Sequence, residues 1–225
     1  MKKIITAIAF IALTTVSAKA IDFGGFSVTA GLANNTSVFG ASGTESEYSE
    51  TGTLPETNKE HGIFTDEFSS QFVELGIGQW VSVGYEMTSD PIQTPRTITN
   101  EGKDNQNSVQ VDFNDLETQY VKINFPGGMF AKLGATTMDI KLNHTSAGSR
   151  TYPNRTSEGT SIGLGYQGYV GESGLGYRFE TSYLEFDNVE SNNGVATTGN
   201  FNKVEVTNME GAVAKFAITY TLGRN

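Results

Sequence analysis

Eight stretches of the chain alternate apolar residues with small or charged ones, residue by residue. An alternation of period two is typical of a β-strand that has one apolar and one polar face. Each stretch is close to the length of about 9 to 11 residues that a tilted strand needs to cross a bilayer. The pattern therefore predicts eight strands, over residues 26–39, 68–77, 80–87, 117–125, 129–138, 161–170, 174–186 and 211–222.

The connections between these strands alternate between long and short. Three are tight and contain glycine: 78–79, 126–128 and 171–173. Four are long and polar: 40–67, 88–116, 139–160 and 187–210. If the first strand leaves the periplasm, all long loops fall on the outer side of the membrane, as in bacterial outer-membrane barrels. The chain is thus predicted to be all-β, an eight-stranded antiparallel up-and-down transmembrane β-barrel with four long outer loops and three short periplasmic turns.

The N-terminal residues have the pattern of a targeting segment. Lys2 and Lys3 precede an apolar run over 4–13, and small residues follow at 17–20. The apolar run is too short to span a bilayer, so the pattern predicts a secretory signal peptide, residues 1–20, cleaved before Ile21. Residues 21–225 are predicted to form one barrel in the bacterial outer membrane, with the loops facing the extracellular side.

Periodicity alone does not decide which face of the strands lies inside. In 68–77, for example, Val73 and Leu75 alternate with Glu74 and Gly76, and a soluble barrel with an apolar interior would alternate in the same way. The glycines on the polar face favour a membrane barrel with a polar interior. Inside an eight-stranded barrel they make room for long charged neighbours, whereas on a solvated surface they would only weaken the strands.

With the polar face inside, the lumen would carry nearly balanced charges. Charges in a space of low dielectric are tolerated only when they are paired and hydrogen-bonded, so we predict an internal salt-bridge network that plugs the barrel. The network is either purely structural or part of a proton or ion path. Its predicted members are Glu74, Glu86, Lys122, Lys132, Arg178, Glu180 and Lys215.

Composition narrows the classes of function. Removal of residues 1–20 would change the formal charge from -10 to -13, which excludes nucleic acid as an expected partner. The chain has no cysteine, so neither disulfides nor thiol chemistry are expected. No apolar run reaches the roughly 18 residues of a helical span, and no motif indicates a cofactor.

Local strings, together with the signal peptide, the eight strands and the long loops, carry a family resemblance. The strings are Ser-Ile-Gly-Leu-Gly-Tyr at 161–166 and Gly-Leu-Gly-Tyr-Arg-Phe at 174–179. On these features the chain resembles the eight-stranded outer-membrane β-barrel superfamily that includes the transmembrane domain of outer membrane protein A and the opacity-like surface proteins. The resemblance implies recognition of the last strand by the barrel assembly machinery, but it specifies no activity.

The long loops differ in charge. The loop over 40–67 has one lysine and seven acidic residues, which could hold a hard divalent cation that bridges to lipopolysaccharide or could simply be solvated. It lacks the ligand spacing of a calcium loop, so no metal site is assigned. Lys141, Arg150 and Arg155 suit the loop over 139–160 to lipopolysaccharide phosphates. Outer-membrane lipids and lipopolysaccharide are therefore the expected partners, together with an extracellular ligand that the sequence does not identify.

Catalytic chemistry has one candidate set of residues. Only two histidines are present, which leaves little room for nucleophilic or metal catalysis. His144, Ser146 and Glu158 could supply a base, a nucleophile and a carboxylate, and their spacing is similar to that of the outer-membrane lipid A 3-O-deacylases, which are also eight-stranded barrels. In those enzymes the motif lies on the final hairpin, whereas here it lies between the fifth and sixth strands.

The sequence therefore predicts a small, closed, non-enzymatic outer-membrane barrel. Its role would be structural, or it would present surface loops for adhesion or as a receptor. The alternative is a narrow porin-like channel, which would require the charges of the lumen to rearrange. An esterase like the lipid A 3-O-deacylases is the third hypothesis.

Overall fold

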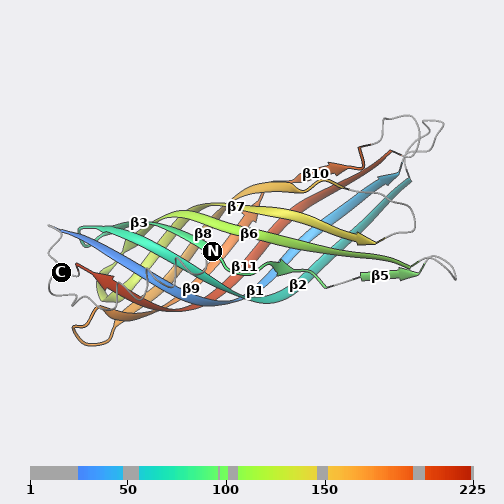
Figure 1. Cartoon of the computed structure of the whole chain (residues 1–225). Helices are drawn as coiled ribbons and strands as arrows, with labels where there is room; N and C mark the ends of the chain where they lie inside the picture. The colour runs from blue at the N-terminus through green and yellow to red at the C-terminus, as the bar shows by residue number, and fades with distance from the viewer. Residues whose placement is uncertain are drawn as a thin grey trace.

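The fold is that of the predicted barrel. In the computed structural model of the chain, residues 25–47, 56–95, 97–100, 106–145, 152–194 and 201–223 are described. The predicted signal peptide, residues 1–20, lies outside the described residues. Eight antiparallel strands form the barrel (Figure 1): β1 (Phe26–Glu47), β2 (Glu56–Ile77), β3 (Val81–Thr88), β6 (Gln106–Asn124), β7 (Met129–Thr145), β8 (Arg155–Tyr169), β9 (Leu175–Phe186) and β11 (Asn202–Leu222).

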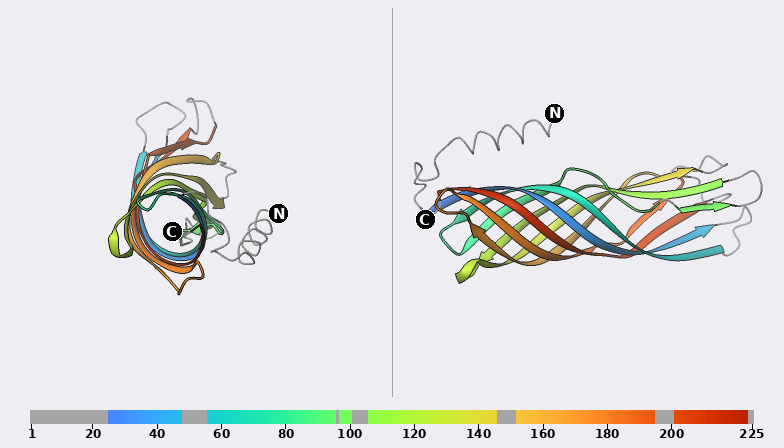
Figure 2. Two further views of the ribbon diagram at one scale, coloured as in Figure 1. Left: turned by 90° about the vertical axis from the view of Figure 1, so that its left-hand side faces the viewer. Right: turned by 90° about the horizontal axis from the view of Figure 1, so that it is seen from below.

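The sheet closes on itself between its first and last strands. β1 pairs with β2 along its whole length, and it pairs with β11 from Val28↔Leu222 to Glu47↔Asn202. Figure 2 shows the resulting ring of strands in the view along the barrel. Closure matters because an open sheet would leave a row of unpaired backbone groups at each edge.

The three tight turns join strands at one end of the barrel, as predicted. Gly78 begins the first turn with a φ of 62°, and Gly127 and Gly128 in the short 3-10 helix η2 (Pro126–Gly128) have φ values of 82° and 88°. Glycine adopts these conformations without the steric cost of a side chain. Within the described part of the chain, no helix is long and apolar enough to cross a membrane.

The boundaries predicted for the long loops were too wide. Much of 40–67 continues β1 and β2, which have 22 residues each and remain paired up to Glu47↔Glu56. β6, β7 and β11 likewise extend into the predicted loops. These segments lack a regular apolar face, so the periodicity did not mark them, but backbone hydrogen bonds from the neighbouring strand continue to hold them.

Beyond the end of β3, the barrel wall divides into two sheets. The chain leaves β3 at Thr88 and forms β4 (Ile92–Gln93) and β5 (Thr97–Asn100), which pair only with β6 in the described region, whereas β10 (Val189–Asn192) pairs with β11. The strands of the two sheets can be followed in Figure 1, and their side chains enclose an apolar core. We call this core the outer core; its buried members are Phe39, Phe68, Ile92, Phe113, Leu116, Met138, Ile140, Leu184, Phe186, Val189, Met209 and Val213.

The outer wall near the tight turns is apolar and exposed. Every barrel strand contributes large apolar side chains that are 41 to 59% exposed: Leu32, Val73, Val83, Val121, Leu133, Ile162, Phe179 and Ile218. A continuous apolar surface of this kind is unfavourable in water and is the surface that a barrel presents to lipid. The polar faces of the same strands point inward, which confirms the predicted orientation of the two faces.

Glycines on the inner face make room for aromatic rings. Gly31 of β1 lies opposite Phe72 of β2, and a Cβ atom on Gly31 would lie only 2.2 Å from Phe72 Cζ. Gly165 is similarly close to the ring of Phe130. The expectation that these glycines accommodate long charged residues was therefore wrong at these positions, because the rings lean over the glycines.

Candidate functional site

The structure brings the seven charged residues predicted for the lumen into the barrel interior. They come from six strands, β2, β3, β6, β7, β9 and β11, and each is 1 to 9% exposed. Their contacts divide them into two layers. We call them the Glu74 group, formed by Glu74, Lys122 and Arg178, and the Glu86 group, formed by Glu86, Lys132, Glu180 and Lys215.

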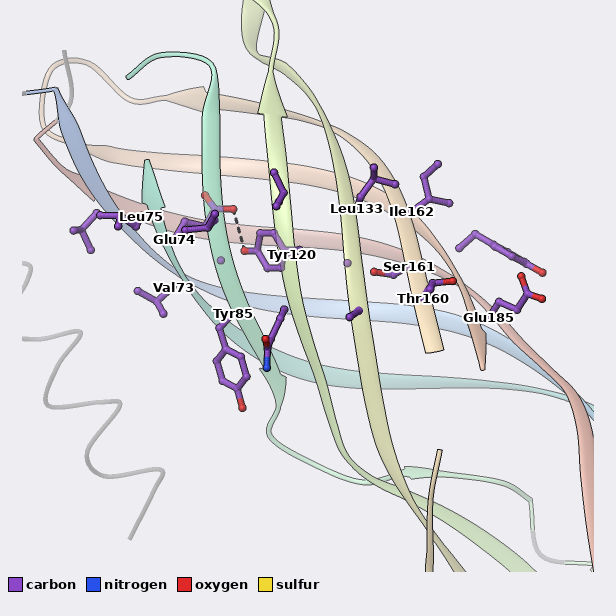
Figure 3. Close-up of a pocket in the computed structure, with 18 residues that line it drawn as sticks. Val73, Glu74, Leu75, Tyr85, Tyr120, Leu133, Thr160, Ser161, Ile162 and Glu185 are labelled. Atoms are coloured by element: carbon purple, nitrogen blue, oxygen red, sulfur yellow. Dashed lines mark hydrogen bonds between the residues drawn. The ribbon is translucent and has the colours of Figure 1, made fainter. Parts of the chain in front are cut away.

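The carboxylate of Glu74 is surrounded by donors. Arg178 donates from Nη1 and Nη2 to its two oxygens at 2.8 and 2.7 Å, and Lys122 Nζ donates at 2.6 Å. Tyr120 adds a hydrogen bond of 3.0 Å; Figure 3 shows the two side chains pointing toward each other, while Val73 and Leu75 point away. Two-pronged Arg–carboxylate pairs of this kind are among the strongest hydrogen-bonded contacts in proteins.

Aromatic rings complete the surroundings of Arg178. Its guanidinium carbon lies 4.5 Å from the centroid of the Phe72 ring and 5.1 Å from that of Phe130. Lys122 Nζ lies 5.4 Å from the Phe130 centroid. A cation over an aromatic face is stabilised electrostatically, most strongly when water is excluded, so the Glu74 group is held by both ion pairs and rings.

The Glu86 group is a ring of two acids and two bases. Lys215 Nζ lies 2.7 Å from Glu86 Oε2 and 3.3 Å from Glu180 Oε1. Lys132 Nζ pairs with the same two carboxylates. Ser70 Oγ donates to the other oxygen of Glu86 at 2.7 Å. The formal charge of this group is zero, which suits burial at the centre of the barrel.

The arrangement ties distant parts of the chain together across the lumen. Glu74 and Arg178 are 104 residues apart in sequence, and Lys215 and Glu86 are 129 apart. The chemistry available is that of paired charges and hydrogen bonds. Within the ranges that the structure describes, no three His, Cys, Asp or Glu side chains lie close enough to hold a metal ion.

Sequence reasoning did not identify the aromatic partners of the network. Tyr120, Phe72 and Phe130 each lie two residues from a network member on the same strand, Lys122, Glu74 and Lys132 respectively. Their position on the inward register was the signal that could have found them.

The esterase candidates lie apart where they can be placed. Ser146 is outside the described residues. His144 lies in β7, where its backbone pairs with Val109 of β6, and Glu158 lies in β8 opposite Thr137. Thr137 and His144 are seven residues apart along β7, about 23 Å at the usual rise of a strand. The strand register therefore does not place Glu158 beside His144.

Several polar residues of the predicted loops hold the outer sheets together. Asp66 Oδ2 accepts a hydrogen bond from the backbone N of Gln93 at 2.9 Å, which links β2 to β4. Arg155 Nε donates to the carbonyl of Glu190 at 2.9 Å, which links β8 to β10. Arg150 lies outside the described residues. These contacts give Asp66 and Arg155 structural partners.

The barrel wall also carries a wide depression of about 1210 Å³ (Figure 3). Four of its lining residues, Val73, Leu75, Leu133 and Ile162, are 42 to 59% exposed. The depression therefore belongs largely to the apolar outer wall, although Glu74 and its hydrogen-bond partner Tyr120 are also among its lining residues.

No family model matches the sequence, and no curated protein matches it. The structure is similar to several solved barrels. The outer membrane protein AlkL shares 10% identity, with 90% of this chain and 92% of that chain covered and a TM-score of 0.49. OprG from Pseudomonas aeruginosa shares 12% identity, with coverage of 86% and 97% and a TM-score of 0.46. The outer membrane protease OmpT from Escherichia coli shares 10% identity, with coverage of 92% and 100% and a TM-score of 0.42.

Proposed function

We propose that the protein is a closed barrel of the bacterial outer membrane that conducts no solutes and presents an acidic, strand-built surface outside the cell. The observation that carries this proposal is that charged and apolar side chains fill the lumen. The Glu74 and Glu86 groups pair their charges across the interior, and the outer core packs apolar side chains beyond them. A solute would have to separate buried ion pairs, which is costly in a space of low dielectric.

The distribution of charge supports the role of the outer surface. Ranges 40–69, 88–117, 139–160 and 185–210, whose described residues belong to the outer half, contain 20 acidic and 7 basic residues. Between residues 21 and 225, the remainder of the chain contains 5 of each. The formal charge of -13 thus belongs to these four ranges, whereas the rest of the chain after residue 20 is neutral. Such a field attracts cationic partners and repels anionic ones.

Conductance in a planar lipid bilayer tests the closed lumen. We expect the refolded barrel to be silent at voltages where a refolded porin, prepared in the same way, conducts. Heat-modifiable gel mobility must first show that the barrel is folded. Discrete, salt-dependent openings of the folded protein would contradict the proposal and favour the porin-like channel, in particular if Glu86→Ala altered them.

Binding to immobilised polylysine tests the acidic outer surface. We expect binding that weakens as NaCl rises, because the Debye length falls from about 10 Å at 0.1 M to about 3 Å at 1 M. The triple variant Glu67→Gln, Glu158→Gln, Glu185→Gln removes three exposed outer carboxylates and should bind several-fold more weakly.

The matched control for this binding is Glu172→Gln, which changes an exposed carboxylate in a tight turn at the other end of the barrel. It should leave polylysine binding unchanged when the barrel is inserted in vesicles with its outer half exposed. Binding that is insensitive to salt, or an equal loss in both variants, would argue against an acidic docking surface.

A further inference from the structure

A small cavity lies between the Glu86 group and the outer core. It offers a volume of about 40 Å³ to the centres of water molecules. All eight barrel strands contribute to its lining, so it lies across the interior of the barrel. We call it the lumen chamber; its floor is formed by Glu86, Lys132 and Lys215, and its roof by Phe68, Leu116, Leu184 and Val213.

Three residues that line the chamber carry a buried polar atom whose hydrogen-bonding capacity is not filled within the described part of the chain. Asn35 Oδ1, Thr88 Oγ1 and Ser161 Oγ are buried, and none has a hydrogen-bond partner among the described residues. The side chains of Asn35 and Ser161 belong to residues that are only 1% and 6% exposed. Buried polar groups in folded proteins are nearly always bonded to protein or to ordered water, and leaving them unbonded is unfavourable.

We propose that the lumen chamber holds an occluded cluster of water molecules, which complete the hydrogen bonds of Asn35, Thr88 and Ser161. The volume accommodates about three waters, since each needs roughly 10 to 15 Å³ of space for its centre. Water can donate to the amide oxygen of Asn35 and can both donate to and accept from the two hydroxyl groups.

The charges of the floor favour water over an ion. Lys132 and Lys215 oppose a cation, and Glu86 opposes an anion. These groups are already paired with one another, so a neutral ligand costs the least electrostatic energy. The apolar roof separates the chamber from the outer medium. The cluster is therefore a sealed, hydrated layer inside a closed barrel, and this inference rests on the closed lumen proposed above.

X-ray hydroxyl-radical footprinting tests the chamber, because radiolysis of a trapped water oxidises the side chains beside it. Phe68, Phe39 and Phe113 are chemically identical and similarly buried, at 6%, 6% and 8% exposed, but only Phe68 lines the chamber. In the folded protein in detergent, we expect oxidation of Phe68 to exceed that of Phe39 and Phe113 several-fold. Weak oxidation of all three rings would overturn the water cluster.

A second comparison places the water in the chamber. Val213→Phe extends the roof into the cavity and should abolish the excess oxidation of Phe68. Met209→Phe, in the same strand but among outer-core residues away from the chamber, should retain it. Persistence of the excess in folded Val213→Phe would overturn the assignment. Strong oxidation of all three rings in the unmodified protein would instead indicate an open water path, and it would overturn both the occluded cluster and the closed lumen. If Val213→Phe does not fold, the comparison of Phe68 with Phe39 and Phe113 in the unmodified protein still tests the proposal.

Discussion

Replacing Arg178 with alanine is expected to lower the free energy of unfolding by about 3 to 5 kcal/mol, the usual cost of removing one partner of a buried ion pair. Arg178 is 1% exposed and makes both of its ion-pair bonds to Glu74. Its removal leaves Glu74 buried with Lys122 as the one remaining cation within bonding distance in the described lumen. Urea unfolding in lipid vesicles, followed by the fluorescence of Trp80, the single tryptophan, measures the loss.

Two controls separate burial from charge in this experiment. Lys203→Ala breaks the exposed pair with Glu190, whose atoms lie 2.6 Å apart, and should cost about 0 to 1 kcal/mol. The triple variant Glu74→Leu, Lys122→Leu, Arg178→Leu removes all three buried charges of the Glu74 group and should cost less than Arg178→Ala alone, because no charge of this group remains buried. A loss for Arg178→Ala no larger than that for Lys203→Ala would contradict a tightly paired lumen.

The second large effect is the destabilisation expected when a side chain is added at Gly31, beside the ring of Phe72. Gly31→Ala should lower the free energy of unfolding by about 1 to 3 kcal/mol, the usual cost of overpacking. The new Cβ would lie 2.2 to 2.9 Å from three atoms of the Phe72 ring, so the ring must move away from its place above the Arg178 guanidinium. The same unfolding assay measures the change.

Gly43→Ala is the matched control, since Gly43 lies in the same strand and no atom lies within 4 Å of its would-be Cβ. It should be nearly neutral. Adding Phe72→Leu to Gly31→Ala should cost less than the sum of the two single changes, because a smaller side chain relieves the contact. Strict additivity would show that the ring and the glycine do not share space as described.

The membrane half of the fold could be predicted because a bilayer imposes a simple rule on the chain. One face of each strand meets lipid and the other meets the lumen, so Val73 and Leu75 alternate with Glu74 and Gly76, and the rule repeats in eight strands. The half of the barrel away from the tight turns has no regular apolar outer face. There the strands continue because their neighbours supply hydrogen bonds, a contribution that the residues of one strand do not reveal.

The alternation of inward and outward side chains along each strand also located the charged residues of the lumen. It could not show which of these charges pair with one another. Whether Arg178 meets Glu74 or Glu86 depends on the stagger between strands far apart in sequence, which is fixed only when β1 and β11 close the barrel. The same closure places Phe72 and Phe130 around the guanidinium and positions the outer core and the lumen chamber. The sequence by itself determined the strands of the membrane half, their inward residues and the acidic excess of the long connections, since these follow from local period and composition. Only the tertiary structure decided which charges pair and where the interior is dry or polar, because those depend on contacts between strands that the chain brings together by closing.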